Sequence, residues 1–529
     1  MPTDCISYQN SGYFSTLIQD YLEQKPDLKP LYNNFPVLEN FEKQIIEKQQ
    51  NFNNQNRIPL VSVLKEQYAA LEISDLTQQN IELLAHESTF TVTTGHQLNL
   101  FSGPLYFLYK IISTINLTKE LKSKYPNFNF VPVYWMATED HDFEEINYFN
   151  FKGKKFRWNT ESTGPVGRLS TEGLTEFFEI YALELGSSTN ANVLKKLFED
   201  AYLKHNTLAD ATRFLANGLF SSQGLVIIDA DSADLKRAFV PYIKEELLEQ
   251  TSFKAVQETI EKLKNYTVQV NPREINLFYI EDNLRERIVF ENDKFMVNNT
   301  KTSFSKEEIL NLLESNPEKF SPNVIMRPLY QEIILPNLCY IGGGGEIAYW
   351  LELKSFFDAV NITFPMILVR NSVLLTTEKQ AKKADQLGLS WKDLFTKPAD
   401  LVNAVTHKIS EFPIDLTPQK EILEKQFEYL SELAQKTDKS FTGAVKAQEV
   451  KQKKGLENLE KRLLKAQKRK LNDQLERVVD LQCQLFPNNS LQERQSNFSE
   501  FYLEKGEQLI PLLTQKLKPL STNFSIITI

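Results

Sequence analysis

Two short polar clusters carry the residue types that bind ligands and move protons. Each follows a strand-like run, at 90–93 and at 130–136. Histidine exchanges a proton near neutral pH, glycine lets the backbone approach a ligand closely, and grouped carboxylates hold an amine, a magnesium ion or a proton. Both clusters are therefore candidates for a substrate site. Their members are Thr94, Gly95, His96 and Gln97 in the first, and Glu139, Asp140, His141 and Asp142 in the second.

Each cluster also has a structural explanation. The first is compatible with a polar turn that exposes a histidine, and taken alone this is the simpler interpretation. The second is compatible with the charged first turn of a helix, where acidic side chains interact favourably with the helix dipole. That explanation accounts for Glu144 and Glu145 but not for His141. With the first cluster beside it, we favour a site.

The segment between the clusters explains why they should meet. Strand, helix and strand in succession outline a β-α-β unit, whose two strands run the same way. Pro104 lies at an early helical position, where its missing N–H costs nothing. Both clusters would then lie at the carboxyl edge of one parallel sheet, where open α/β folds bind ligands. The apolar face of this helix comprises Leu105, Leu108, Ile111, Ile112, Ile115 and Leu121.

A third candidate is the run of four glycines at 342–345, which Glu346 follows at the start of a predicted helix, 347–357. Such a loop at a helix N-terminus can hold an anion with backbone N–H groups. The run matches neither of the common glycine-rich phosphate motifs. A tight crossing of backbones in the core is the alternative.

Further strands are predicted at 224–229, 338–341 and 365–370, with a helix at 232–249 after the first of them. Polar residues lie at or near the ends of these strands and loops. Each taken singly is more often a structural hydrogen-bonding group than a catalytic one. They are Asp229, Arg327, Arg370 and Asn371.

Four regions are predicted along the chain. Residues 1–87 form an N-terminal helical segment that packs on the core. Residues 88–415 form an α/β core with insertions near 151–220 and 250–320, the second containing short antiparallel strands at 265–300. Residues 416–486 have heptad spacing typical of a coiled coil, interrupted near Thr442 and Gly443. Residues 487–529 return to the core and end in a strand.

Bulk properties exclude several classes of function. The net charge of −9 gives no overall attraction to nucleic acid. The three cysteines are too far apart for a metal or redox pair and are typical of a reducing compartment. No signal peptide or membrane-spanning run is visible, so we expect a cytoplasmic protein without membrane partners. No motif for covalent nucleophilic catalysis occurs.

The motifs together resemble a known family, the cysteine-adding enzymes of bacillithiol synthesis, or BshC. The resemblance extends from about residue 90 to 510. It rests on VTTGHQ at 92–97, FSGPLY at 101–106 with Lys110, VPVYWMA at 131–137, EDHDFEE at 139–145, SPNV at 321–324 with Arg327 and Pro328, GEIAYW at 345–350, and LQER at 491–494 with Asn497 and Tyr502.

The resemblance implies a Rossmann-like core with two inserted connecting segments and a C-terminal coiled coil that makes a homodimer. It implies ligation of cysteine to the amino group of glucosaminyl-malate, the last step of bacillithiol synthesis. The implied fold is similar to that of class I aminoacyl-tRNA synthetases and of the mycothiol cysteine ligase. The synthetase HIGH and KMSKS signatures and zinc-binding cysteines are absent from this sequence. No zinc is expected.

The main hypothesis is an amide-forming ligase that activates the carboxyl of cysteine, most simply as an acyl-adenylate, with ATP or ADP as the expected nucleotide. Asp140, His141 and Asp142 are the predicted catalytic residues, which would hold the amine or assist its deprotonation. The residues predicted to bind substrate or nucleotide are Thr94, Gly95, His96, Gln97, Gly103, Tyr106, Lys110, Glu139, Gly344, Gly345, Glu346, Tyr349, Arg370 and Asn371.

Two other functions stay open at this point. One is a non-catalytic, nucleotide-binding dimer that serves as a scaffold in a thiol pathway, and the predicted coiled coil is its main support. The other is a metal-dependent hydrolase that uses His96, His141 and Asp142. Nucleotide turnover distinguishes the first from a ligase, and metal analysis tests the second.

Overall fold

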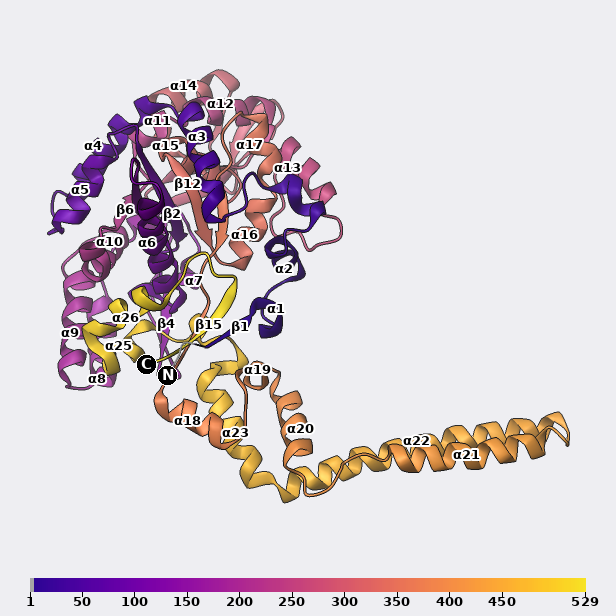
Figure 1. Cartoon of the computed structure of the whole chain (residues 1–529). Helices are drawn as coiled ribbons and strands as arrows, with labels where there is room; N and C mark the ends of the chain where they lie inside the picture. Colours follow the sequence, from indigo (N-terminus) through magenta and orange to yellow (C-terminus); the bar gives the residue numbers. More distant parts are fainter. Residues whose placement is uncertain (1–3) are drawn as a thin grey trace. The chain divides into compact units, whose positions relative to one another are not determined.

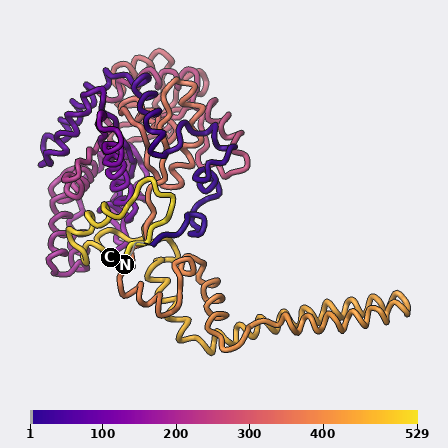
Figure 2. The backbone as a smooth tube through the Cα atoms, in the orientation of Figure 1, coloured from indigo at the N-terminus to yellow at the C-terminus, as the bar shows by residue number. Residues whose placement is uncertain are grey.

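The computed structural model describes residues 4–529, which form two compact units (Figures 1 and 2). The first unit contains residues up to Gln9, Tyr13–Leu375 and Leu491–Ile529. The second contains Asn10–Gly12 and Thr376–Ser490. The sequence predicts a core that extends to residue 415, whereas the helices from residue 376 onward pack within the second unit.

A five-stranded parallel sheet lies at the centre of the first unit. The strand order is β13-β12-β2-β3-β6, and every neighbouring pair is parallel. The predicted Rossmann-like sheet is confirmed, because each of the five strands proposed for it takes part in it. The bounds are Met366–Val369 for β13, Asn337–Gly342 for β12, Thr89–His96 for β2, Asn129–Met136 for β3 and Val226–Asp229 for β6.

The predicted β-α-β unit is formed by β2, α6 (Tyr106–Lys124) and β3. Thr94 pairs with Tyr134 and His96 with Met136, so both strands end at the same edge of the sheet. Apolar side chains from β2, β3, β12, β13 and α6 contribute to one buried cluster, which packs the helix against the sheet. Its members include Phe90, Val92, Leu117, Leu121, Leu338 and Ile341.

A strained turn separates β2 from α6. Phe101, Ser102 and Gly103 have positive φ, and a Cβ at Gly103 would lie 2.6 Å from Cβ of Asn99. The side-chain amide of Asn497 donates to the carbonyl oxygens of Phe101 and Gly103 at 2.8 and 2.6 Å. The C-terminal segment thus fixes the turn that starts the helix.

The N-terminal segment packs on the sheet, as Figure 1 shows for α3 and α4. Its main helices are α2 (Thr16–Leu22), α3 (Phe41–Asn51), α4 (Arg57–Tyr68) and α5 (Asp75–Leu83). Lys48 of α3 forms a fully buried ion pair with Glu332 at 2.8 Å. Tyr21 donates to the carbonyl oxygen of Ile367 in β13. Near the chain ends, β1 (Asp4–Ser7) and β15 (Asn523–Thr528) pair antiparallel, which confirms the predicted terminal strand.

Two insertions interrupt the parallel sheet. The first contains the hairpin β4 (Tyr148–Phe151) and β5 (Lys154–Arg157), followed by α8 (Leu174–Leu185), α9 (Thr189–Phe198) and α10 (Leu208–Phe220). The second contains an antiparallel sheet in the order β10-β9-β8-β7-β11, which confirms the predicted antiparallel strands. Their bounds are Ser303–Phe304, Lys294–Val297, Leu284–Glu291, Leu277–Glu281 and Phe320–Pro322.

Two helices predicted as continuous are each divided in two. The one at 232–249 forms α11 (Ala233–Arg237) and α12 (Val240–Glu249), because the ring of Pro241 cannot follow the carbonyl of Arg237 in one helix. The one at 347–357 forms α16 (Gly344–Leu351) and α17 (Lys354–Ala359). Helix α16 starts earlier than predicted, because Glu346 accepts a hydrogen bond from the Gly343 N–H at 2.8 Å.

The second unit is helical and contains the predicted coiled coil as an antiparallel hairpin. Helices α21 (Thr417–Ala434) and α22 (Lys439–Lys470) pack side by side (Figure 1). The predicted interruption at Thr442–Gly443 is wrong, since α22 continues through both residues. The turn lies at 435–438 instead, where Asp438 accepts backbone hydrogen bonds and caps α22. In residues 4–529, no helix is both long and apolar enough to cross a membrane.

Candidate functional site

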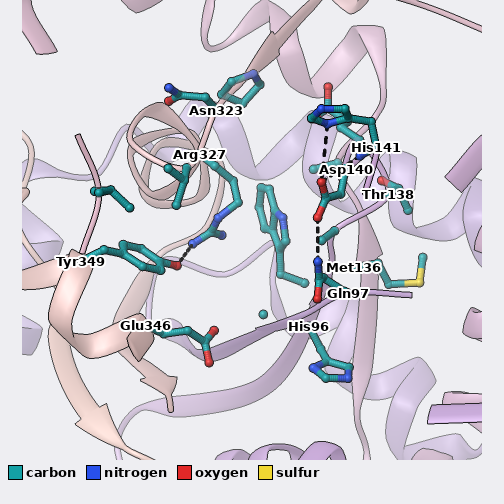
Figure 3. Close-up of a pocket in the computed structure, with 18 of the residues that line it drawn as sticks. His96, Gln97, Met136, Thr138, Asp140, His141, Asn323, Arg327, Glu346 and Tyr349 are labelled. Atoms are coloured by element: carbon teal, nitrogen blue, oxygen red, sulfur yellow. Dashed lines mark hydrogen bonds and ion pairs between the residues drawn. The ribbon is translucent and has the colours of Figure 1, made fainter. Parts of the chain in front are cut away.

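A cavity of about 750 Å³ opens at the carboxyl edge of β2, β3 and β12 (Figure 3). Elements of the sheet, of α6 and α16, of the second insertion and of the C-terminal segment all line it. Small-molecule ligands and cofactors commonly occupy cavities of this size. The predicted site residues that line it are Gly95, His96, Gln97, Tyr106, Lys110, Glu139, Asp140, His141, Gly345, Glu346, Tyr349 and Arg370.

Five predicted site residues do not line the cavity. The Thr94 hydroxyl donates to the Ile341 carbonyl at 2.7 Å and so links β2 to β12. Gly103 serves the turn before α6, and Gly344 faces the N-terminal segment near Ile18 and Phe14. Asn371 is buried and donates to the Lys518 carbonyl at 2.7 Å. Asp142 is exposed. Local sequence placed these residues near the edge, but the fold leaves them outside the cavity lining.

One side of the cavity is a cationic floor, which we define as Lys110, Arg370 and Arg494 around the ring of Tyr106. The three cations lie 5.8, 4.9 and 6.0 Å from the ring centroid. Lys110 and Arg370 are buried, whereas Arg494 is exposed. Arg370 donates to both carboxylate oxygens of Glu493, at 3.1 and 2.8 Å. Arg494 forms no ion pair with any residue in 4–529.

Glu346 organises the glycine loop beside this floor. Its carboxylate accepts from Lys110 at 2.6 Å, from the Tyr340 hydroxyl at 2.7 Å and from the Gly343 N–H at 2.8 Å. Burial alone would raise the pKa of Glu346, but Lys110 and these donors outweigh it and hold the pKa below its usual value. Glu346 is therefore a carboxylate that orders the loop, and it is already paired.

Space requires a glycine at 342 but not at 345. A Cβ at Gly342 would lie 2.9 Å from Cβ of Glu346 and 3.0 Å from the ring of Tyr340. The constraint at Gly342 therefore comes from neighbouring side chains and not from the backbone crossing that the sequence left open as the alternative. Nothing lies within 4 Å of a Cβ built at Gly345, which lines the cavity. The loop thus combines a packing constraint at one end with an open approach at the other.

His96 is buried beside the floor, with its ring 5.0 Å from Phe107 and 5.5 Å from Tyr106. Burial lowers its pKa well below the usual range, and the charge of Lys110 lowers it further. The imidazole is therefore neutral at pH 7 and its Nε2 has no hydrogen-bond partner among residues 4–529. Nε2 of His96 can therefore form one hydrogen bond with a ligand, but the neutral ring does not act as a general acid.

Another part of the cavity lining is an acidic rim, which we define as Glu139, Asp140 and His141. Figure 3 shows Asp140 and His141. Asp140 accepts from the Gln97 side chain at 3.0 Å and from the His141 backbone N–H at 2.8 Å. Glu139 is already paired with Lys236, at 2.5 Å. Asp140 is therefore the rim carboxylate best placed to accept a hydrogen bond from a ligand.

His141 contacts a residue from the second insertion. Its Nδ1 lies 2.7 Å from Nη1 of Arg285. Burial lowers the pKa of His141, and the charge of Arg285 lowers it further. Since a guanidinium only donates, Nδ1 accepts, and the neutral ring then carries its hydrogen on Nε2. His141 is thus set up as a hydrogen-bond donor rather than as a base.

The cavity includes residues that the sequence did not single out for a role. Arg327 lies near the rings of Trp135 and Tyr340, at 5.7 and 5.6 Å, and approaches the Tyr349 hydroxyl at 3.4 Å (Figure 3). Its place beside a strand was visible in the sequence, but these contacts were not. Other lining residues also received no predicted role, although three of them belong to motifs on which the family resemblance rests. Those three are Trp135, Asn323 and Arg494. The residues outside the motifs are Arg273, Arg285, Arg287 and Tyr340.

The sequence analysis also did not predict a network of ion pairs that includes Glu139. Lys236 is fully buried and contacts Glu139 at 2.5 Å and Asp231 at 3.3 Å. Asp231 in turn accepts from Arg168 at 2.8 Å. These residues lie 29 to 97 positions from Glu139 by their own numbering, so only the fold brings them together. Among residues 4–529, no three His, Cys, Asp or Glu side chains are arranged to hold a metal ion.

Comparisons with known proteins agree along the whole chain. The family model described as bacillithiol biosynthesis BshC, N-terminal Rossmann-like domain, matches residues 1–371, and that of the BshC C-terminal coiled-coil domain matches 373–529. Proteins named "Putative cysteine ligase BshC" are similar. The one from Flavobacterium johnsoniae is 84% identical, with 100% of both chains covered. Those from Cytophaga hutchinsonii and Bacillus cereus are 40% and 28% identical, covering 98% and 94% of this chain and 98% and 95% of theirs.

Proposed function

Since the chain belongs to the BshC family, we propose that it joins the carboxyl of L-cysteine to the amino group of glucosaminyl-malate, as the last step of bacillithiol biosynthesis. The family membership confirms the resemblance drawn from the sequence motifs, and it makes the protein an enzyme of the ligase class. The substrates and the route of activation are our proposal.

The observation that carries this proposal is the division of one cavity into a cationic floor and an acidic rim. Amide formation needs an activated carboxyl with an anionic leaving group, and an amine that loses a proton as it attacks. The anionic leaving group would be stabilised by the positive charge of the floor, from Lys110, Arg370 and Arg494. The proton of the amine would be accepted by Asp140. His141, as a donor, would orient the acceptor substrate.

We propose activation by ATP through an acyl-adenylate. A carboxylate oxygen of cysteine attacks the α-phosphorus, and the bond to the β-phosphate oxygen breaks to release pyrophosphate. The amine nitrogen then attacks the acyl carbon, a C–N bond forms, and the C–O bond to AMP breaks. The proton that the amine loses passes to the Asp140 carboxylate and then to solvent.

The direct test combines the purified protein with cysteine, ATP and glucosaminyl-malate. We expect bacillithiol by mass spectrometry, together with equimolar AMP. Release of ADP would overturn the adenylate route while leaving the ligase. ATP binding by calorimetry without turnover in any substrate mixture would instead favour the scaffold function.

A matched pair of variants tests the rim. Asp140→Asn keeps the size of the side chain but removes the charge that accepts the proton, and should lower kcat about 10²-fold. Asp142→Asn makes the same chemical change at an exposed position outside the cavity and should retain activity. Equal loss in both variants, or none in either, would remove Asp140 from the mechanism.

We further propose that a second copy of the chain covers the helical hairpin, which makes a homodimer. Large apolar side chains are exposed along α21 and α22, and the family model for this region is a coiled coil. Sedimentation should give a dimer that Ile422→Glu and Val450→Glu together dissociate. The exposed residues are Ile422, Tyr429, Leu433, Phe441, Val450 and Leu459.

We also place this activity in the cytoplasm. Three cysteines, Cys5, Cys339 and Cys483, are free thiols in the described part of the chain. Sparse unpaired cysteines are typical of a reducing compartment. Fractionation of cells that express a tagged chain tests the location.

A further inference from the structure

The cationic floor holds more positive charge than its own carboxylates balance. Among residues 4–529, the floor cations form ion pairs only with Glu346 and Glu493, so one cation is in excess. His96 adds no negative charge, because it is a neutral ring. Lys110 and Arg370 are the paired cations, so the excess charge is that of Arg494, whose exposed guanidinium is available to a ligand. A bound anion would restore the balance.

One donor of the floor is buried and unpartnered. The Nη1 and Nη2 atoms of Arg370 are occupied by Glu493, by the Asn371 carbonyl and by Ser372. Its Nε has no partner among residues 4–529, although Arg370 is only 3% exposed. This Nε lies 3.8 Å from a Cβ built at Gly343, on the side of the glycine loop. The free N–H therefore points to the same corner as the start of α16.

Besides the guanidinium and ammonium groups, the glycine loop supplies backbone N–H groups as hydrogen-bond donors. The first N–H groups of an α-helix have no intrahelical partner, and α16 begins at Gly344. The Gly343 N–H is taken by Glu346, whereas Gly345 lines the cavity with nothing within 4 Å of its missing side chain. An anion can therefore approach the backbone here, where the helix dipole also favours negative charge.

From these contacts we propose that the cationic floor is a phosphate site, formed by Arg370 Nε, Lys110, Arg494 and the N-terminus of α16. It rests on the proposed function, in which the leaving groups are phosphates of a nucleotide. A guanidinium edge, an ammonium and backbone N–H groups on different sides match the tetrahedral arrangement of phosphate oxygens better than a planar carboxylate. Lys110 and Arg370, held by carboxylates, would need little rearrangement to bind it.

Binding measurements test the site without relying on turnover. Calorimetry with inorganic pyrophosphate, ATP and adenosine separates the phosphate contribution from that of the base. Arg494→Gln changes an exposed, unpaired side chain and should fold normally. We expect pyrophosphate and ATP to bind it about tenfold more weakly, with a shallower salt dependence, and adenosine to bind as in wild type.

A second variant addresses the buried donor. Arg370→Lys keeps the positive charge beside Glu493 but removes the Nε–H, and should weaken pyrophosphate binding at least as much. Arg287→Gln is the matched control, since it removes an exposed cation at the cavity wall away from the floor. It should change pyrophosphate affinity less than twofold.

The outcomes separate this site from the proposed function. Unchanged pyrophosphate affinity in Arg494→Gln and Arg370→Lys would overturn the phosphate site, whether or not the enzyme makes bacillithiol. A selective loss of cysteine affinity in the same variants would also overturn it, because the floor would then bind a carboxylate. Weakened pyrophosphate binding supports the site even if no amide product forms.

Discussion

The two sides of the cavity differ in how their charges are assembled. The acidic rim is one continuous run, 139–141, after a single strand. The cationic floor joins Lys110 of α6, Arg370 after β13 and Arg494 of the C-terminal segment, each more than a hundred residues from the next. Yet the dense rim is mostly paired internally, through Lys236, Gln97 and Arg285. The dispersed floor keeps an unpaired donor.

This difference teaches that density of charge in the sequence is a poor measure of what is available to a ligand. Glu139 belongs to the most conspicuous cluster of the chain, but its carboxylate is bound to Lys236. Arg370 belongs to no such cluster, although it was among the predicted binding residues, and its Nε is buried without a partner in residues 4–529. What matters is which groups remain unpaired after folding. The variants below probe that contrast, beginning with the largest expected effect.

Removal of Lys110 should have the largest effect. Lys110→Met leaves the partly buried carboxylate of Glu346 without its cation, which should cost about 3 kcal/mol of stability and lower kcat/KM by at least about 10²-fold. Urea unfolding and steady-state kinetics measure the two effects. Lys119→Met, on the exposed face of the same helix, should change neither.

A double variant makes this test of the floor sharper. If the cost comes from the unpaired carboxylate, then Lys110→Met with Glu346→Gln should be more stable than Lys110→Met alone. Additive losses would show that the two side chains do not depend on each other. The ion pair between Lys110 and Glu346 would then contribute little to the stability of the floor.

Substitution of Glu352 should give the next largest effect, a change in the pH dependence of stability. It is fully buried at the end of α16 and accepts from the backbone N–H groups of Gln269 and Val270, at 2.6 and 3.2 Å. Burial raises its pKa to about 7, against the lowering by these two donors. The folded state therefore holds this proton more tightly than the unfolded chain does.

The sign of the effect follows from that difference in pKa. Below the unfolded value the carboxyl is protonated in both states, and its contribution to stability is lost as pH rises through about 7. Glu352→Gln should thus gain stability relative to wild type between pH 5 and 8, by about 3 kcal/mol. Thermal unfolding across this range measures it, with the exposed Glu249→Gln as control. A pH-independent difference would contradict the assignment.

The glycine loop offers a smaller, local contrast. Gly342→Ala places a Cβ 2.9 Å from Glu346 and should destabilise the protein by about 1–3 kcal/mol. Gly345→Ala meets nothing within 4 Å and should leave stability within about 0.5 kcal/mol of wild type. Chemical unfolding compares them. Equal losses would mean that the loop is constrained uniformly, rather than open on its cavity side.

The smallest effect is expected at the rim. Arg285→Gln removes the cation that helps to lower the pKa of His141, while Asp140 and Asp142 continue to raise it. The midpoint of the His141 ring should therefore move to higher pH, toward or above its usual value. NMR titration of the ring protons measures it, with His141→Gln to assign the signal. An unchanged midpoint would show that the rim is independent of the second insertion.

Much of the fold could be predicted from local pattern. The alternation before 94 and 137, and the helical spacing between them, were sufficient for β2, α6 and β3. Some wrong predictions involve non-local contacts. One is the division of the helix at 347–357, where Glu352 accepts hydrogen bonds from the distant loop at 269–270. The coiled-coil turn was misplaced because Gly443 is tolerated within α22, whereas Asp438 provides the cap.

The sequence by itself determined the family, the parallel sheet and the position of both polar clusters at one edge, because these depend on motifs and on the periodicity of neighbouring residues. Only the tertiary structure decided which charges are paired. Coulomb interactions depend on distance and burial, and neither quantity is local in the chain. Glu139 therefore meets Lys236, and Arg370 meets Glu493, through the fold alone. The same packing leaves one Arg370 N–H unpaired in the cavity.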